Sequence, residues 1–176
     1  MVTISLCMIV RNEEAVLERC LHSVCNVVDE IILVDTGSED RTKEIAGAQS
    51  DRMHELPLSG DFFAGGNFSL SKATMDYCMW MDADDVLLEA DTKALLELKE
   101  TLDPSVQVVM LPYHIAFDAQ GKPTFSYYRE RLIRNGQGMR WEGAVHEVIT
   151  PVQPIAYGKA AVTHQKIGPG DPDRNL

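Results

Sequence analysis

Short apolar runs that alternate with segments of helical spacing are the feature that most constrains how this chain folds. Ile4–Val10 and residues 30–34 are nearly continuous apolar runs, the pattern of strands buried on both faces of a parallel sheet. A helix is predicted after each run. The first follows an N-cap at Asn12, and the second spans residues 38–48 behind an N-cap at Ser38. Strands that alternate with helices predict an open α/β sheet.

The alternation continues through the first half of the chain. A weaker strand is predicted at residues 52–56, and a glycine-rich loop at 59–66 leads to a helix at 68–73. Residues 77–81 form the next predicted strand, which ends in an acidic turn. The helix that follows, residues 92–102, is amphipathic, and an Asp-Pro pair ends it.

From residue 106 the pattern changes to strands separated by turns, which predicts antiparallel structure. The expected strands span residues 106–111, 113–117 and 129–133. The fold class is therefore predicted to be α/β, with an open, mixed, mainly parallel sheet flanked by helices and with an antiparallel portion. A length of 176 residues fits a single domain. Its turn-rich end at 168–173 stops abruptly, which leaves open a truncated C-terminus.

The charge of the chain restricts its partners. Sixteen Lys and Arg against 27 Asp and Glu give a formal net charge of -11. A binder of nucleic acid or of an anionic membrane surface needs a basic face, so neither is an expected partner. A phosphorylated small molecule still fits if a divalent cation mediates the contact.

Cysteine spacing and hydropathy give an expected compartment. Cys7, Cys20, Cys25 and Cys78 form no CxxC pair and lie among apolar neighbours, which is typical of buried, reduced thiols. The apolar run Ile4–Val10 is far shorter than the roughly 18 residues that a membrane span needs. We therefore expect a cytoplasmic protein without an intrinsic membrane span.

Three polar turns follow predicted parallel strands, at residues 11–13, 35–38 and 82–85. In open α/β sheets, ligands bind beyond the carboxyl ends of the strands, so the recurrence of these turns predicts a site. The turn at 82–85 carries three carboxylates in four residues, which repel one another unless a cation or hydrogen-bond donors compensate them. The plainer interpretation is that Asp84 or Asp85 caps the next helix.

Three segments, residues 6–14, 32–42 and 79–85, together resemble family 2 glycosyltransferases with the GT-A fold in their order and spacing. The resemblance implies a nucleotide-binding half, residues 1–105, and an acceptor-side half, residues 106–176. It also implies transfer of a sugar, with inversion, from a nucleotide-diphosphate donor such as a UDP-sugar to an acceptor hydroxyl. The acceptor, whether glycan, lipid-linked or protein, stays open.

The resemblance also assigns residues. Asp35 is expected to accept a base N–H, and Asp82 and Asp84 form the DxD pair at the ribose and the metal, Mn²⁺ or Mg²⁺. His164 is a further candidate metal ligand. A cation between carboxylates and diphosphate would stabilise the charge that develops on the leaving group. The expected donor-binding residues are Val10, Arg11, Asn12, Glu13, Asp35, Gly37, Asn67, Asp82, Ala83 and Asp84.

Residues 141–147 resemble the acceptor-side segment of these enzymes. Inverting transfer needs a base to deprotonate the acceptor hydroxyl. Glu147 is the first candidate for this base, His146 the second and Glu142 the third. A surface strand with alternating polar residues is the competing interpretation of this segment.

The chain departs from the family pattern at one point. Family members often carry an arginine shortly before the position of Asn67, where this chain has Gly65 and Gly66. An arginine there could clamp the diphosphate. The alternatives are backbone N–H groups of this loop, weak donor binding, or a substitute cation, for which the candidates are Arg129, Arg131 and Lys72.

Three other functions fit parts of the sequence. Residues 35–38 match the aspartic protease signature, but a helical pattern follows them, whereas those proteases are all-β. Residues 82–86 fit the motif of an Asp-nucleophile phosphatase, which normally follows the first strand rather than a later one. The third alternative function is that of a domain that binds a nucleotide sugar without catalysing its turnover. No P-loop or GxGxxG motif supports an NTPase or dinucleotide fold.

Overall fold

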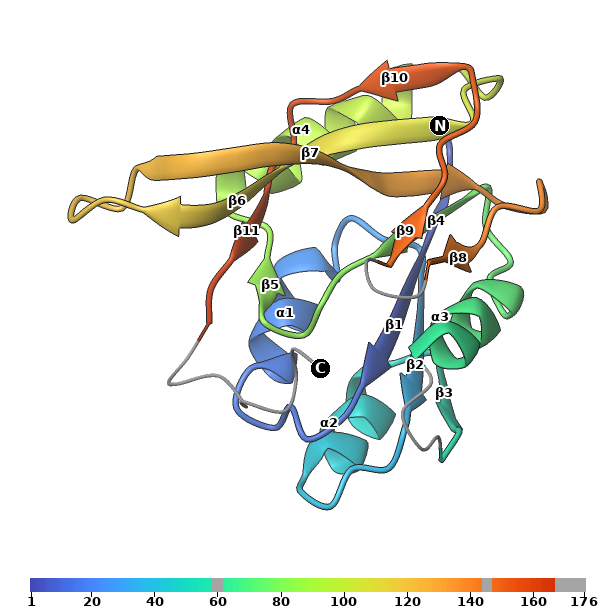
Figure 1. Ribbon diagram of the computed structural model, residues 1–176, viewed down its shortest axis with the longest axis vertical. Coiled ribbons are helices and arrows are strands. Elements are labelled where there is room, and N and C mark those ends of the chain that lie inside the picture. The colour runs from blue at the N-terminus through green and yellow to red at the C-terminus, as the bar shows by residue number, and fades with distance from the viewer. Residues whose placement is uncertain (58–61, 144–146, 167–176) are drawn as a thin grey trace.

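The computed structural model describes residues 1–57, 62–143 and 147–166. Within these ranges the chain forms four helices and eleven strands (Figure 1). The helices are α1 (Leu17–Val24), α2 (Thr42–Gln49), α3 (Phe62–Ser71) and α4 (Glu89–Thr101). The strands are β1 (Ile4–Val10), β2 (Glu30–Asp35), β3 (Arg52–Glu55), β4 (Tyr77–Trp80), β5 (Asp85–Val86), β6 (Val108–Phe117), β7 (Pro123–Arg134), β8 (Trp141–Glu142), β9 (Val148–Ile149), β10 (Ile155–Tyr157) and β11 (Val162–His164).

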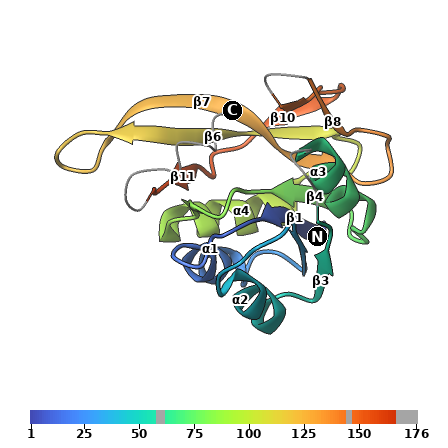
Figure 2. The ribbon, with the colours of Figure 1, turned by 60° about the horizontal axis from the view of Figure 1, so that its bottom comes forward.

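One mixed sheet organises the described chain, in the order β3-β2-β1-β4-β7-β6-β11-β5, with β10 beside β6. The first four strands of this order are parallel, and β7 joins them antiparallel to β4. The long β6–β7 hairpin projects beyond the body of the molecule in both views (Figures 1 and 2). The predicted mainly parallel sheet with an antiparallel portion is confirmed.

Apolar side chains fill both faces of the sheet, as the continuous apolar runs predicted. One core includes Leu6 and Met8 of β1, packed with Leu17 and Leu21 of α1 and with Leu95 of α4. The opposite core includes Cys7, Ile32 and Trp80 together with Leu70 of α3. Figure 2 shows α1, α2 and α4 on one side of the sheet and α3 on the other. Alternate residues of β1 thus serve two cores.

Two predicted helix starts are wrong because their capping residues are used elsewhere. Helix α1 begins at Leu17 rather than directly after Asn12, and Asn12 takes a left-handed φ of 52°. The side chain of Asn12 accepts the N–H of Glu39 at 2.8 Å, across to the neighbouring loop. Helix α2 begins at Thr42, and the hydroxyl of Ser38 accepts the N–H of Asn12 at 3.0 Å.

Helix α3 replaces much of the predicted glycine-rich loop. It begins at Phe62 and contains Gly65 and Gly66, whereas the sequence predicted a helix only from residue 68. Trp141 packs against this helix so closely that a Cβ on Gly66 would lie 2.7 Å from its Cδ1. The glycine therefore permits close packing of helix on strand, and residues 59–61 of the predicted loop lie outside the described ranges.

The predicted strands 106–111 and 113–117 form one strand, β6, which continues through Pro112. Proline has no N–H for a ladder bond. On one edge of β6, however, β10 pairs with residues up to Met110, and the pairing with β11 starts at Tyr113. Pro112 therefore falls between the two partner strands. Strand β7 is likewise longer than the predicted 129–133, and α4 starts at Glu89 rather than at residue 92.

The four cysteines are all free thiols, and Cys7, Cys20 and Cys78 are buried as predicted. Cys25 is exposed, which corrects the prediction for that residue, because it lies at the solvent side of the C-terminal end of α1. Among the described helices, none combines the length and apolar character required to cross a bilayer.

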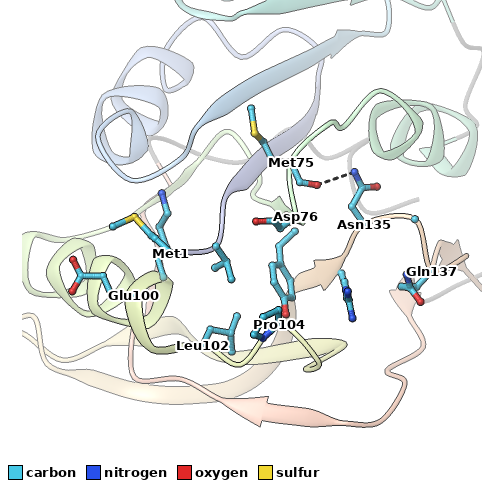
Figure 3. A pocket seen from close by; sticks show the side chains of 13 residues that line it. Met1, Met75, Asp76, Glu100, Leu102, Pro104, Asn135 and Gln137 are labelled. Atoms are coloured by element: carbon cyan, nitrogen blue, oxygen red, sulfur yellow. Dashed lines mark hydrogen bonds between the residues drawn. The ribbon is translucent and has the colours of Figure 1, made fainter.

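A pocket of about 580 Å³ opens at the amino-terminal edge of the parallel strands. Figure 3 shows Met1, Asp76 and Asn135 among its lining residues, with the amide of Asn135 bonded to the carbonyl of Met75 at 3.0 Å. The polar turns predicted to bind a ligand follow the carboxyl ends of β1, β2 and β4, away from this pocket.

Candidate functional site

Asp35, the last residue of β2, is buried at the carboxyl edge of the sheet with one carboxylate oxygen unpaired. Its Oδ1 accepts the N–H groups of Gly37 at 3.0 Å and Ser38 at 2.9 Å. Its Oδ2 has no hydrogen-bond partner among the described residues, although the side chain is only 1% exposed. A buried carboxylate oxygen without a donor is costly, so this atom is suited to a donor from a ligand.

The loop after β1 is fixed against the loop after β2. The N–H of Glu13 donates to the hydroxyl of Thr42 at 2.8 Å, and the carbonyl of Val10 accepts the N–H of Thr36 at 3.1 Å. Val10 and Glu13 are buried and Arg11 is exposed. Since Asn12 also bonds to both residues 38 and 39, the structure brings Val10, Arg11, Asn12 and Glu13 beside Asp35 and Gly37.

The acidic turn after β4 combines exposed and buried carboxylates. Asp82 is exposed, while Ala83 and Asp84 are 1% and 7% exposed. Asp85, which was not among the predicted site residues, is completely buried, and its Oδ2 accepts the N–H of Asp82 at 3.0 Å. The N-cap position of α4 is Leu88, so the plainer interpretation that Asp84 or Asp85 caps the next helix is wrong.

His164 reaches the acidic turn from the other end of the sequence. Strand β11 pairs antiparallel with β5, which sets His164 opposite Asp85. The Nδ1 of His164 lies 3.6 Å from Asp84 Oδ1 and 3.4 Å from Asp85 Oδ1. Ligand atoms of these three residues all lie within 4.8 Å of one another, so the group can hold a metal ion. The structure thus brings two predicted metal ligands, Asp84 and His164, together with Asp85.

A tyrosine and an arginine surround Asp85. The hydroxyl of Tyr113 donates to Asp85 Oδ1 at 2.7 Å, and Nη1 of Arg131 lies 3.7 Å from Asp85 Oδ2. The guanidinium of Arg131 is fully buried between aromatic rings, with its carbon 3.8 Å from the Trp80 ring centroid and 4.4 Å from that of Tyr113. Arg131 therefore compensates the buried charge of Asp85.

The carboxylates of the acidic turn raise the pKa values of two neighbouring side chains, His164 and Tyr113. The hydrogen bond to Asp85 raises the pKa of His164 above its ordinary value, against the effect of partial burial, and the charge of Asp84 adds to the rise. Burial, followed by the negative charge of Asp85, strongly raises the pKa of Tyr113. The site has a negative field, which favours a bound cation.

The segment that the resemblance predicts for the acceptor side includes β8, which pairs with β9 in a small second sheet. Glu147 is exposed, and its carbonyl accepts from Nη2 of Arg129 at 3.3 Å. Glu142 is exposed and bonds to the hydroxyl of Thr150 at 3.2 Å, while His146 lies outside the described residues. Asn67 bonds with the backbone of Trp141 through both its amide atoms, so it joins α3 to β8.

The three candidate substitutes for the missing arginine are all engaged elsewhere. Arg131 is fully buried, with its guanidinium between the rings of Trp80 and Tyr113. Arg129 pairs with Glu130 at 3.0 Å and lies over the Trp80 ring at 4.8 Å. The Nζ of Lys72 lies over the ring of Phe68 at 5.0 Å. The buried Arg131 and Tyr113 were not predictable as partners of Asp85, because neither lies in a recognisable motif.

Comparison with solved structures supports the architecture. The chain resembles glucosyl-3-phosphoglycerate synthase from Mycobacterium tuberculosis, a structure solved with Mn²⁺, uridine diphosphate and glucosyl-3-phosphoglycerate. The TM-score is 0.52 and the sequence identity 25%, over 64% of this chain and 44% of that one. This likeness confirms the predicted GT-A type of fold.

Curated relatives and a family model identify the family. The chain is 37% identical over 150 residues to a TPR repeat-containing protein of Synechococcus elongatus, which covers 85% of this chain and 36% of that protein. It is 36% identical over 84 residues to an uncharacterized glycosyltransferase of Rickettsia typhi, which covers 48% of this chain and 28% of that protein. The chain thus spans only about a third of the length of these relatives. The model of glycosyl transferase family 2 matches residues 5–155, most of the sequence, and the chain belongs to that family.

Proposed function

We propose that this domain transfers a sugar from a nucleoside-diphosphate donor, of the UDP type, to an acceptor hydroxyl with inversion, assisted by a divalent cation. The observation that carries the proposal is the convergence of Asp84 and His164 at the same sheet edge as the unpaired oxygen of Asp35. Family membership favours transfer over the phosphatase and protease alternatives. The similar mycobacterial synthase was solved with Mn²⁺ and uridine diphosphate.

The nucleotide base is proposed to bind at Asp35. A uracil ring offers an N–H donor, and Asp35 Oδ2 is a buried acceptor without a partner among the described residues. Hydrogen bonds to a charged acceptor contribute about 1.5–3 kcal/mol, enough to orient the base. The fixed loops after β1 and β2, with Asn12 and Gly37, form the walls of this proposed pocket.

The cation, Mn²⁺ or Mg²⁺, is proposed to be held by Asp84 and His164, with the exposed Asp82 facing the ribose or the cation. Mn²⁺ and Mg²⁺ prefer carboxylate oxygens, which Asp84 supplies, and imidazole is a common ligand of transition-metal ions, so the donor set fits Mn²⁺ better than Mg²⁺. When bound, such an ion supplies Lewis-acid stabilisation of the departing diphosphate. It also compensates the carboxylates, so that an acidic chain can accept an anionic donor.

Glu147 is proposed as the base that takes the proton of the acceptor hydroxyl, with His146 and Glu142 as the other candidates. Its side chain is exposed, and Arg129 donates a hydrogen bond to its backbone carbonyl, which supports a role at an open acceptor side.

Four free thiols support the expected cytoplasmic location. A glycan, a lipid-linked sugar and a protein all stay candidates for the acceptor.

Calorimetric titration with UDP, with and without Mn²⁺, tests the donor and cation together. We expect binding that depends on Mn²⁺ and that falls at least ~10-fold in Asp84→Ala, because carboxylates without a cation repel a diphosphate. Unchanged affinity in that variant would reject the metal assignment. If the protein binds the donor but shows neither transfer nor slow hydrolysis of the donor, the result would favour a binding domain without turnover.

A further inference from the structure

The Nδ1 atom of His164 lies within 3.6 Å of three oxygen atoms. It lies 3.2 Å from the hydroxyl oxygen of Tyr113, besides its distances of 3.4 Å and 3.6 Å to oxygens of Asp85 and Asp84. The hydroxyl proton of Tyr113 is already donated to Asp85 Oδ1, at the shorter distance of 2.7 Å. A lone pair on Nδ1 would therefore meet only lone pairs, which favours the neutral tautomer that carries its proton on Nδ1.

Asp85 has the contacts of a supporting carboxylate rather than those of an open metal ligand. Its Oδ1 accepts the hydroxyl of Tyr113, and its Oδ2 accepts the N–H of Asp82 at 3.0 Å beside the guanidinium of Arg131. It is 0% exposed, whereas Asp84 is 7% exposed and His164 is only partly buried. A cation bound directly to Asp85 would have to compete with these donors.

We propose that Tyr113 and Asp85 are positioning residues that hold the Nδ1–H of His164, so that Nε2 is presented to the divalent cation. This inference rests on the proposed function and refines it, because the ligands become Asp84 and His164, with Asp85 behind them. Histidines that ligate metals almost always donate their other ring N–H to a carboxylate or a similar acceptor. Arg131, held between Trp80 and Tyr113, places Nη1 3.7 Å from Oδ2 of that carboxylate.

The substitution Tyr113→Phe tests the positioning role by removing one hydroxyl. Mn²⁺ binding is measured without nucleotide, by the loss of the free-ion signal in electron paramagnetic resonance. We expect the dissociation constant for Mn²⁺ to rise about 10- to 100-fold, the usual effect of losing an outer partner of a metal ligand. An unchanged dissociation constant would overturn the proposal.

Tyr77→Phe is the matched control. Tyr77 is also buried, and its hydroxyl donates to the carbonyl of Val106 at 2.6 Å, far from the acidic turn. Both variants lose one buried tyrosine hydroxyl and with it a similar part of the stability. Mn²⁺ affinity should fall in Tyr113→Phe alone, and equal losses in the two variants would show a general effect of destabilisation and reject the positioning role.

The imidazole nitrogens report the tautomer directly. In ¹⁵N-labelled protein without metal, at alkaline pH where the ring is neutral, we expect His164 as the Nδ1–H tautomer, and a mixture in Tyr113→Phe. Added Mn²⁺ should broaden the Nε2 resonance most. A wild-type ring protonated on Nε2, or strongest broadening at Nδ1, would overturn the proposal and make Nδ1 the metal ligand.

The two proposals fail in different ways. If wild-type protein binds Mn²⁺ as described but neither binds nor cleaves a nucleotide donor, the proposed transfer is rejected while the positioning role stands. If the donor binds and is cleaved with a Mn²⁺ affinity that Tyr113→Phe does not alter, the proposed transfer stands and the positioning role is rejected.

Discussion

The two ends of strand β2 carry buried carboxylates with opposite surroundings. Glu30, at its start, accepts hydrogen bonds from the hydroxyl of Ser5 at 2.6 Å, from the N–H and hydroxyl of Thr74 at 3.0 Å each, and from Arg52. Asp35, at its end, binds two backbone N–H groups through one oxygen and leaves the other unpaired among the described residues. The saturated carboxylate joins elements together, and the unsaturated one retains capacity for a ligand.

The largest expected effect is on the stability that Glu30 contributes at the start of β2. Glu30→Ala removes the shared acceptor of Ser5, Thr74 and Arg52, of which only Ser5 is buried, and each hydrogen bond to a charged group contributes about 1.5–3 kcal/mol. We expect a loss of about 3 kcal/mol or more in the free energy of unfolding, measured by urea denaturation. UDP affinity of the folded variant should be unchanged. A large loss of affinity with full stability would reverse the assigned roles of the two ends.

The next largest expected effect is on the affinity for UDP at Asp35, the end of β2 with the unpaired carboxylate oxygen. Asp35→Asn keeps an oxygen for the two backbone N–H groups but removes the charge that the base N–H is proposed to use. We expect UDP affinity to fall about 10- to 100-fold, the equivalent of about 1.5–3 kcal/mol, in calorimetric titration. Stability should change by only about 1 kcal/mol. Wild-type affinity in this variant would exclude Asp35 from the base pocket.

The smallest effect is a pH dependence. Burial by itself would raise the pKa of Glu30, but hydrogen bonds from Ser5, Thr74 and Arg52 outweigh it and hold the pKa below its ordinary value. A lowered folded-state pKa contributes stability above the unfolded pKa of about 4.3, and that contribution is lost as pH falls through the folded value. The stability difference between wild type and Glu30→Gln should therefore shrink below about pH 4. A constant difference from pH 7 to pH 3 would contradict this.

The strands of the parallel part were predictable because burial on both faces leaves a continuous apolar run, as in β1 and β2. The helix starts were not, because Asn12 and Ser38 use their polar atoms across two loops that are distant in sequence. The same reason hid Tyr113 and Arg131: their importance to Asp85 comes from sheet pairing, not from spacing. Local pattern predicts elements and their order, whereas contacts between elements decide which polar side chains are available.

The pairing of β11 with β5 bears on the order in which parts of the protein fold. His164 and Asp85 are 79 residues apart in sequence, and the β6–β7 hairpin lies between their strands along the chain. Contacts of such sequence separation are slow to form, because the entropy of closing the long loop is lost before the contact is gained. The loop around Asp35, whose partners Gly37 and Ser38 are close to it in sequence, is therefore expected to form before the histidine side of the acidic turn.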